Sequence, residues 1–299
     1  MSNAAATANT LLPPQLLHQL ERLELVSRKI LRGRMKGERR SKRKGQSVEF
    51  ADFRNYVAGD DLRFIDWNMY ARLDKLFLKL FLEEEDLHFF SLIDCSMSMD
   101  FGEPSKLQYA KQLAAALGFV GLCRADRVRI ESFATTHKNP GPVLRGRASL
   151  WRMIEYIHSI APGDNVPLVD AIRNFCIRNR GKGILVLITD LMDKQGYESA
   201  LRYLVAQQMD VYVIHVLSPE EINPDVKGDL KLVDSEDADV AEITVSKPLL
   251  DRYQRTLAAF IDGAREFCVR RGMSYVMANT DIPVERLVAS YLRQRGLVR

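Results

Sequence analysis

The chain has 299 residues, of which 46% are hydrophobic and 27% charged, a composition typical of a globular protein that can bury a sizeable core. Its net charge of +4 is unevenly spread, because residues 28–44 hold ten Lys or Arg against one Glu. This basic segment carries +9, which leaves −5 for the rest of the chain. The four cysteines lie far apart without a C-x-x-C pair, which argues against a zinc site or a disulfide framework.

The sequence shows no segment that is expected to enter or cross a membrane. The longest apolar run is Leu113–Cys123, far shorter than the ~20 residues that span a bilayer. The first ten residues are small and polar and do not resemble a secretory signal. We therefore expect a cytoplasmic protein.

Residues 1–45 are predicted to form an N-terminal helix followed by a basic linker. Pro13-Pro14 is typical of a helix start, and the apolar residues after it follow helical spacing. These residues are Leu16, Leu20, Leu23, Ile30 and Leu31. Glycines then interrupt the pattern inside the basic segment.

The basic segment 28–44 allows two kinds of partner. Its charge could attract nucleic acid or an acidic lipid surface. It lacks the interleaved aromatic residues of a dedicated RNA-binding module, and a solvated linker is the simpler interpretation. We expect no specific nucleic-acid binding, and peripheral membrane contact through this segment stays an alternative.

Residues 46–86 are predicted to be a β-rich region of strands and turns. They are dense in aromatic and β-branched residues, and Gly59-Asp60-Asp61 indicates a turn. Residues 76–82 fit either a strand or a helix by pattern, and we interpret them as a strand.

Residues 87–299 alternate strand-like and helix-like stretches. Strands are expected near 88–93, 128–133, 184–188, 211–216 and 273–277, and helices near 107–120, 148–160, 167–179, 196–208, 249–267 and 284–292. This alternation predicts an α/β fold with a doubly wound, mainly parallel sheet covered on both faces. Residues 225–246 break the rhythm and indicate a β insertion, for which pairing with the strands of 46–86 is one arrangement.

Polar side chains with ligand spacing follow the first strand of this domain. Asp94, Ser96 and Ser98 form a D-x-S-x-S motif, and Asp190 ends a second buried strand. Oxygen ligands of this kind suit Mg²⁺, and open α/β sheets bind ligands beyond the carboxyl ends of their strands. The alternative is that these residues only cap the next helix. If the two strands are near neighbours, the four side chains come together and predict a metal site.

Two stretches resemble known families. D-x-S-x-S with a later strand-terminal Asp resembles the metal-ion-dependent adhesion site of von Willebrand factor A domains. The run from Glu49 to Trp67, followed by Ala71-Arg72 and Lys79, resembles the signature of the bacterial domain-of-unknown-function fifty-eight family. In that family the signature precedes a von Willebrand A-like domain, and the resemblance covers roughly residues 33–294.

One departure from the adhesion-site pattern concerns the third ligand. The resemblance implies a Thr before a helix, but Val166 stands at the matching position and has no oxygen to offer. Asp164 or Asn165 are possible substitutes. We therefore expect Mg²⁺ to bind weakly.

The charged residues of the signature have two interpretations. They can form an ion-pair lattice that fixes the turn around Gly59 and anchors Trp67, which is the interpretation we favour. They can instead form a docking surface. The signature residues are Arg54, Tyr56, Gly59, Asp60, Asp61, Arg63, Asp66, Trp67 and Arg72.

The sequence offers little support for catalysis. A phosphohydrolase using Asp94 would need a second acid where Ser96 stands, and neither a G-x-S-x-G motif nor a P-loop is present. The family resemblance implies a non-enzymatic adaptor that works with a MoxR-type AAA+ ATPase in the maturation or remodelling of client protein complexes. A metal-independent scaffold that docks through residues 50–72 is the alternative, and a phosphohydrolase is the less favoured one.

Overall fold

The computed structural model describes residues 11–27, 48–83, 87–133, 141–163, 166–179, 182–233 and 240–299. The basic segment 28–44 and the two proposed substitute ligands at positions 164 and 165 lie outside these residues. The chain divides into two compact units. The larger comprises Met1–Arg34 and Leu87–Arg299, and the smaller comprises Met35–Asp86.

A six-stranded sheet forms the centre of the larger unit. In spatial order its strands are β10 (Ser274–Asn279), β7 (Met209–Leu217), β6 (Gly183–Thr189), β3 (His88–Asp94), β4 (Arg127–Phe133) and β5 (Val143–Leu144). All neighbours are parallel except β4 and the short edge strand β5. After β3 the chain adds β4 and β5 on one side of it. It then crosses back and adds β6, β7 and β10 on the other side of β3. The strand order therefore reverses between β3 and β6.

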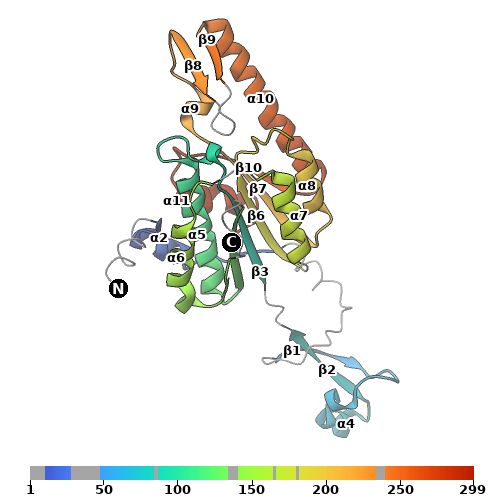
Figure 1. The fold of residues 1–299 in the computed structure, drawn as a ribbon. Helices are drawn as coiled ribbons and strands as arrows, with labels where there is room; N and C mark the ends of the chain where they lie inside the picture. The colour runs from blue at the N-terminus through green and yellow to red at the C-terminus, as the bar shows by residue number, and fades with distance from the viewer. Residues whose placement is uncertain are drawn as a thin grey trace. The chain divides into compact units, whose positions relative to one another are not determined.

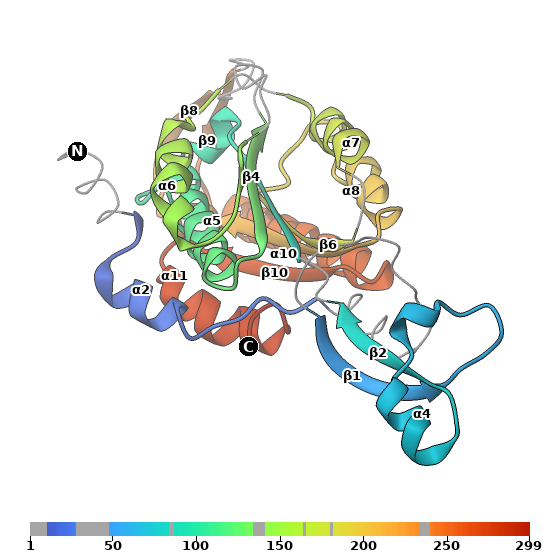
Figure 2. The same cartoon turned by 90° about the horizontal axis from the view of Figure 1, so that it is seen from below.

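Helices cover both faces of this sheet because its central strands are apolar on both sides (Figures 1 and 2). One core lies between the sheet and α2 (Pro14–Leu20), α5 (Lys106–Cys123), α6 (Leu150–Ser159) and α11 (Val284–Arg286). The other core lies against α7 (Leu168–Arg178), α8 (Glu198–Val205) and α10 (Lys247–Arg270). The doubly wound fold predicted from the sequence is confirmed. No helix in the described part of the chain is both long and apolar enough to cross a membrane.

The predicted N-terminal helix belongs to the larger unit. Leu12, Leu16 and Leu20 are almost fully buried in the first core, and Leu25 bridges to Val298 at the other end of the chain. The last helical segment, α11, continues into a π-helical turn at Leu287–Leu292. Both ends of the described chain therefore pack on the same side of the sheet.

The β insertion forms its own hairpin. After α9 (Pro219–Ile222), β8 (Asp229–Val233) pairs antiparallel with β9 (Val240–Thr244). The suggestion that this segment pairs with the strands of 46–86 is wrong. A hairpin closes a short loop, whereas pairing with a distant segment must overcome a larger loss of chain entropy.

The smaller unit is a twisted hairpin with a short helix. β1 (Val48–Asn55) pairs antiparallel with β2 (Phe77–Glu83), which confirms the strand expected at 76–82. Between them lie the 3₁₀ turn η1 (Leu62–Phe64) and α4 (Trp67–Leu73), a helix where the sequence pattern predicted turns and strands. Asp66 starts α4 by accepting hydrogen bonds from the backbone N–H groups of Asn68 and Met69.

The close approach of β3 and β6 gives a test of the sheet. A Cβ at Gly183 would lie 2.3 Å from the carbonyl oxygen of His88, so Gly183→Ala must displace a neighbouring strand. We expect a loss of about 1–3 kcal/mol in the free energy of unfolding, measured by urea denaturation. Gly263→Ala in α10 is the control, because its Cβ would meet only the Tyr197 hydroxyl at 3.4 Å. Equal stability of the two variants would contradict this packing.

Candidate functional site

The predicted ligands meet at the carboxyl ends of β3 and β6. Asp94 is the last residue of β3, and Thr189 is the last residue of β6, with Asp190 following it. The register pairs Ile93 with Ile188, which places the side chains after them next to each other. This is the point where the strand order reverses, and ligands of open α/β sheets bind at such points. The adjacency that the metal prediction required is present.

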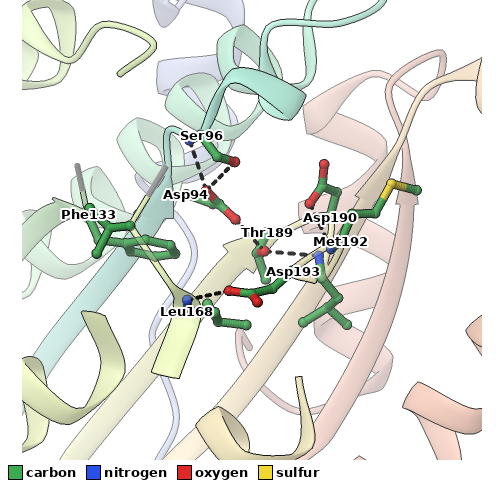
Figure 3. Close-up of a pocket in the computed structure, with 10 residues that line it drawn as sticks. Asp94, Ser96, Phe133, Leu168, Thr189, Asp190, Met192 and Asp193 are labelled. Carbon is green, nitrogen blue, oxygen red and sulfur yellow. Dashed lines mark hydrogen bonds between the residues drawn. The ribbon is translucent and has the colours of Figure 1, made fainter. Parts of the chain in front are cut away.

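Hydrogen bonds organise the D-x-S-x-S motif around Asp94 (Figure 3). Asp94 Oδ1 accepts from the Ser96 backbone N–H at 3.0 Å and from the Ser96 hydroxyl at 2.8 Å. The hydroxyls of Ser96 and Ser98 are 3.0 Å apart. Thr189 Oγ1 donates to Asp94 Oδ2 at 2.6 Å and so joins the two strands. Four side-chain oxygen groups, from Asp94, Ser96, Ser98 and Thr189, thus form one connected cluster.

The cluster does not cap the helix that follows it. Ser96 precedes only a 3₁₀ turn, η2 (Met97–Met99), and makes no side-chain cap hydrogen bond there. Helix α5 begins later, at Lys106, and its cap is Ser105, which accepts from the Gln108 backbone N–H. The capping alternative for D-x-S-x-S therefore fails.

A small pocket opens beside Asp94. Its enclosed part has room for one water or one ion. Three carboxylate residues line it together with hydroxyl and apolar groups (Figure 3). The lining residues are Asp94, Ser96, Phe133, Val166, Leu168, Thr189, Asp190, Leu191, Met192 and Asp193.

Asp190 lies at the site, but both of its carboxylate oxygens are already engaged. Oδ1 accepts from the Met192 backbone N–H at 3.0 Å, and Oδ2 accepts from Lys106 Nζ at 2.8 Å. Lys106 also donates to Glu221 Oε1 at 2.5 Å. The prediction that Asp190 is a ligand stays a prediction, and any cation at Asp190 would share its carboxylate with the Lys106 ammonium.

Sequence reasoning missed Lys106, although the chain contains a signal for it. Lys106 is the first residue of α5, where a positive charge is unfavourable next to the positive end of the helix dipole. The residue is fully buried, and burial alone would lower its pKa. The carboxylates of Asp190 and Glu221 outweigh this effect and raise the pKa, so Lys106 stays charged.

Asp94 differs from Asp190 because it has hydrogen bonds but no ion pair within the described residues. Burial and, after it, the neighbouring charge of Asp190 together raise the pKa of Asp94 to about 6, against the hydrogen bonds from Thr189 and Ser96 that lower it. A buried carboxylate without a counter-charge is unfavourable when ionised. A bound cation would relieve this cost at Asp94.

The position expected to hold a Thr ligand is apolar. Val166 lines the pocket just before α7, as the sequence comparison implied. Asp193, which sequence reasoning missed, lines the same pocket and accepts hydrogen bonds from the backbone N–H groups of Leu168 and Gln195, each at 2.6 Å. Its role is to hold the start of α7 at the pocket. No three His, Cys, Asp or Glu side chains in the described ranges form a ready metal cluster, so hydroxyl groups must complete any cation site.

The signature residues of the smaller unit form ion pairs that support its turns. Arg54 Nη2 lies 2.8 Å from Asp60 Oδ1, and Asp60 Oδ2 accepts from the Val57 backbone N–H. Gly59 within this turn has φ +103°, a conformation that favours glycine. Lys79 pairs with Asp66, the residue that caps α4. These contacts agree with the lattice interpretation for Asp60 and Asp66.

The lattice interpretation is wrong for two other residues. Trp67 is not anchored, since its side chain is 61% exposed and only packs edge-on against Tyr70. Arg63 pairs with Asp61 two residues away, and both are exposed. Arg72 is also exposed, whereas Tyr56 is half-buried and its backbone N–H donates to the Leu76 carbonyl.

Comparison with known proteins assigns the chain to a family. The family model described as "Protein of unknown function DUF58" matches residues 52–260, and the chain belongs to this family. Uncharacterized protein Mb1516 of Mycobacterium bovis and Uncharacterized protein Rv1480 of Mycobacterium tuberculosis are each 29% identical over 255 residues, which cover 82% of this chain and 79% of theirs.

Two solved structures resemble the chain at low sequence identity. The conserved hypothetical protein BatB from Bacteroides thetaiotaomicron is 16% identical with a TM-score of 0.43, covering 70% of this chain and 98% of its own. The pilus adhesin SpaC from Lactobacillus rhamnosus GG is 10% identical with a TM-score of 0.42, covering 72% of this chain and 32% of its own.

The raised pKa of Asp94 predicts a pH dependence of stability. The folded protein holds a proton on Asp94 up to about pH 6, whereas the unfolded chain releases it near the ordinary value of 3.8. This contribution to stability is present below pH 4 and is lost as pH rises to 6, by up to about 3 kcal/mol. In chelator, Asp94→Asn should therefore be more stable than the parent at pH 7.5, and the difference should shrink toward pH 4. A difference independent of pH would contradict the assignment.

Proposed function

We propose that this member of the DUF58 family is a non-catalytic interaction module that works in the cytoplasm as an adaptor for a MoxR-type AAA+ ATPase. In this role it presents client proteins for ATP-driven maturation or remodelling. The observation that carries the proposal is the ion-sized pocket beside Asp94, lined by carboxylates and hydroxyls at the switch point of the sheet. The ATPase partner rests on the family resemblance of the sequence.

The donor set fits a hard divalent cation such as Mg²⁺. Asp94 supplies a carboxylate without a counter-charge, and the hydroxyls of Ser96 and Ser98 are already gathered beside it. Mg²⁺ prefers oxygen ligands and keeps several waters, so a few protein oxygens suffice. When bound, the cation would neutralise Asp94 and offer its remaining positions to a carboxylate of the partner. Asp190, already paired with Lys106, contributes charge at the edge of the site.

A binding role suits the site better than phosphohydrolase chemistry. The Ser96 hydroxyl, where a phosphatase would need its second acid, donates to Asp94 and can neither protonate a leaving group nor activate water as a carboxylate does. This feature supports the non-catalytic proposal.

A second candidate is metal-independent docking through residues 50–72, and one observation favours it. The smaller unit exposes large apolar side chains around η1 and α4. They are Val57, Leu62, Phe64, Trp67, Tyr70 and Leu73. Exposed apolar groups gathered on so short a segment are typical of contact surfaces.

Capture of a purified MoxR-type ATPase from the same organism separates the two candidates. If the adhesion-type site binds the partner, the ATPase is captured in Mg²⁺ and not in chelator. Asp94→Ala should reduce the affinity for the ATPase at least about tenfold, whereas Trp67→Ala should bind normally. Arg63→Ala is the matched surface control in the smaller unit and should fold and bind, because its ion pair is exposed. Capture that ignores Mg²⁺ and Asp94→Ala but is lost in a folded Trp67→Ala would move the binding surface to residues 50–72.

Val166 provides a second test of the cation site. Val166→Thr keeps the shape of the side chain and adds one oxygen at the pocket, so Mg²⁺ should bind more tightly, by about tenfold. The expected readout is a larger rise in melting temperature with added Mg²⁺ than in the parent protein, since a ligand of the native state stabilises it. Val166→Ala, which adds no oxygen, is the control. If Mg²⁺ leaves all three melting temperatures unchanged, the cation assignment is wrong.

A further inference from the structure

Lys106, at the start of α5, forms ion pairs with residues of two other segments next to the pocket. Its ammonium group lies 2.8 Å from Asp190 Oδ2, after β6, and 2.5 Å from Glu221 Oε1, in α9. The side chains of Lys106 and Asp190 are each only 1% exposed. Glu221 is fixed in turn, because its other oxygen accepts from the Ser218 backbone N–H at 2.8 Å. The Lys106–Asp190 ion pair is therefore buried and held in place by neighbouring hydrogen bonds.

The pocket carboxylates are neutralised unequally. Asp190 has the Lys106 ammonium, and Asp193 has two backbone N–H groups. Asp94 accepts hydrogen bonds from Ser96 and Thr189, but no cationic side chain of the described chain pairs with it. Lys106 does not line the pocket, so it balances Asp190 without filling the space beside Asp94.

We propose that Lys106 is the permanent counter-ion of Asp190 and thereby sets the affinity of the pocket for divalent cations. This inference rests on the proposed cation site. With Lys106 in place, a cation beside the serine hydroxyls can neutralise Asp94 but not Asp190, and Mg²⁺ binds weakly unless a partner carboxylate completes its shell. Without the Lys106 charge, Asp94 and Asp190 together form a two-carboxylate site of higher affinity.

The two carboxylates come from neighbouring strands, which supports their cooperation once Lys106 is removed. Both line the same pocket, and the charge of Asp190 already acts on Asp94 (Figure 3). The cost of removing Lys106 is that buried Asp190 and Glu221 lose their counter-charge. Bound Mg²⁺ can offset this cost at Asp190 but not at Glu221, which belongs to α9 and does not line the pocket.

The test is a double-mutant cycle on Mg²⁺ affinity of the full chain, measured by titration calorimetry at pH 7.5. In the presence of Lys106, Asp190→Asn should weaken Mg²⁺ binding by less than about threefold, whereas Asp94→Asn should weaken it at least tenfold. Lys106→Met should tighten binding at least tenfold, and in that background Asp190→Asn should now cost at least tenfold. Glu221→Gln is the matched control, and it should leave the affinity within about threefold of the parent.

Equal effects of Asp190→Asn with and without Lys106 would overturn the inference. If Lys106→Met does not fold, the single variants decide, because a loss in Asp190→Asn as large as in Asp94→Asn contradicts the counter-ion role. If the parent shows no measurable binding, a gain in Lys106→Met supports the role and no gain overturns it. The proposed function fails separately, when capture of the ATPase ignores Mg²⁺ and Asp94.

Discussion

Thr189 donates a hydrogen bond of 2.6 Å to Asp94 across the seam between β6 and β3, and the candidate site is built around this contact. It depends on the parallel pairing of the two strands, which aligns their carboxyl ends. That pairing depends in turn on the crossover from β4 and β5 back to β6, because only a reversal of strand order leaves the two ends open to one crevice. The position of the pocket therefore follows from the topology of the sheet.

The electrostatic state of the pocket follows from burial. A carboxylate in a buried position is costly unless a positive group or several hydrogen-bond donors accompany it. Lys106 supplies a positive group for Asp190. Asp94 accepts three hydrogen bonds but has no cationic partner among the described residues, and its burial beside the charge of Asp190 raises its pKa. This asymmetry supports the proposal that a small cation binds through Asp94 and the neighbouring hydroxyl groups.

The sheet and the motif were predictable because both are local signals. Alternating apolar strands and helices predicted the doubly wound fold, and D-x-S-x-S directly after a strand predicted the gathering of Asp94, Ser96 and Ser98. Strand order was not local, so the adjacency of Asp94 and Asp190 could only be stated as a condition. The helix α4 was missed because its cap, Asp66, lies within a strand-like aromatic stretch.

Lys106 escaped prediction for a different reason. Its position at the start of a helix is an unfavourable place for a positive charge, but this signal does not identify its partners, which lie 84 and 115 residues away along the chain. Trp67 was predicted to be anchored, because a large aromatic side chain is usually buried, but it is 61% exposed. Both errors concern tertiary contacts, which residue type and spacing do not determine.

The proposed adaptor role depends most directly on whether a divalent cation occupies the pocket beside Asp94. A crystal structure of the protein grown with Mn²⁺, which scatters anomalously and takes oxygen ligands as Mg²⁺ does, would locate the ion. We expect an anomalous peak about 2 Å from a carboxylate oxygen of Asp94 and from the hydroxyls of Ser96 and Ser98, with the Lys106–Asp190 pair intact. An ordered pocket that holds only water in millimolar Mn²⁺ would contradict it.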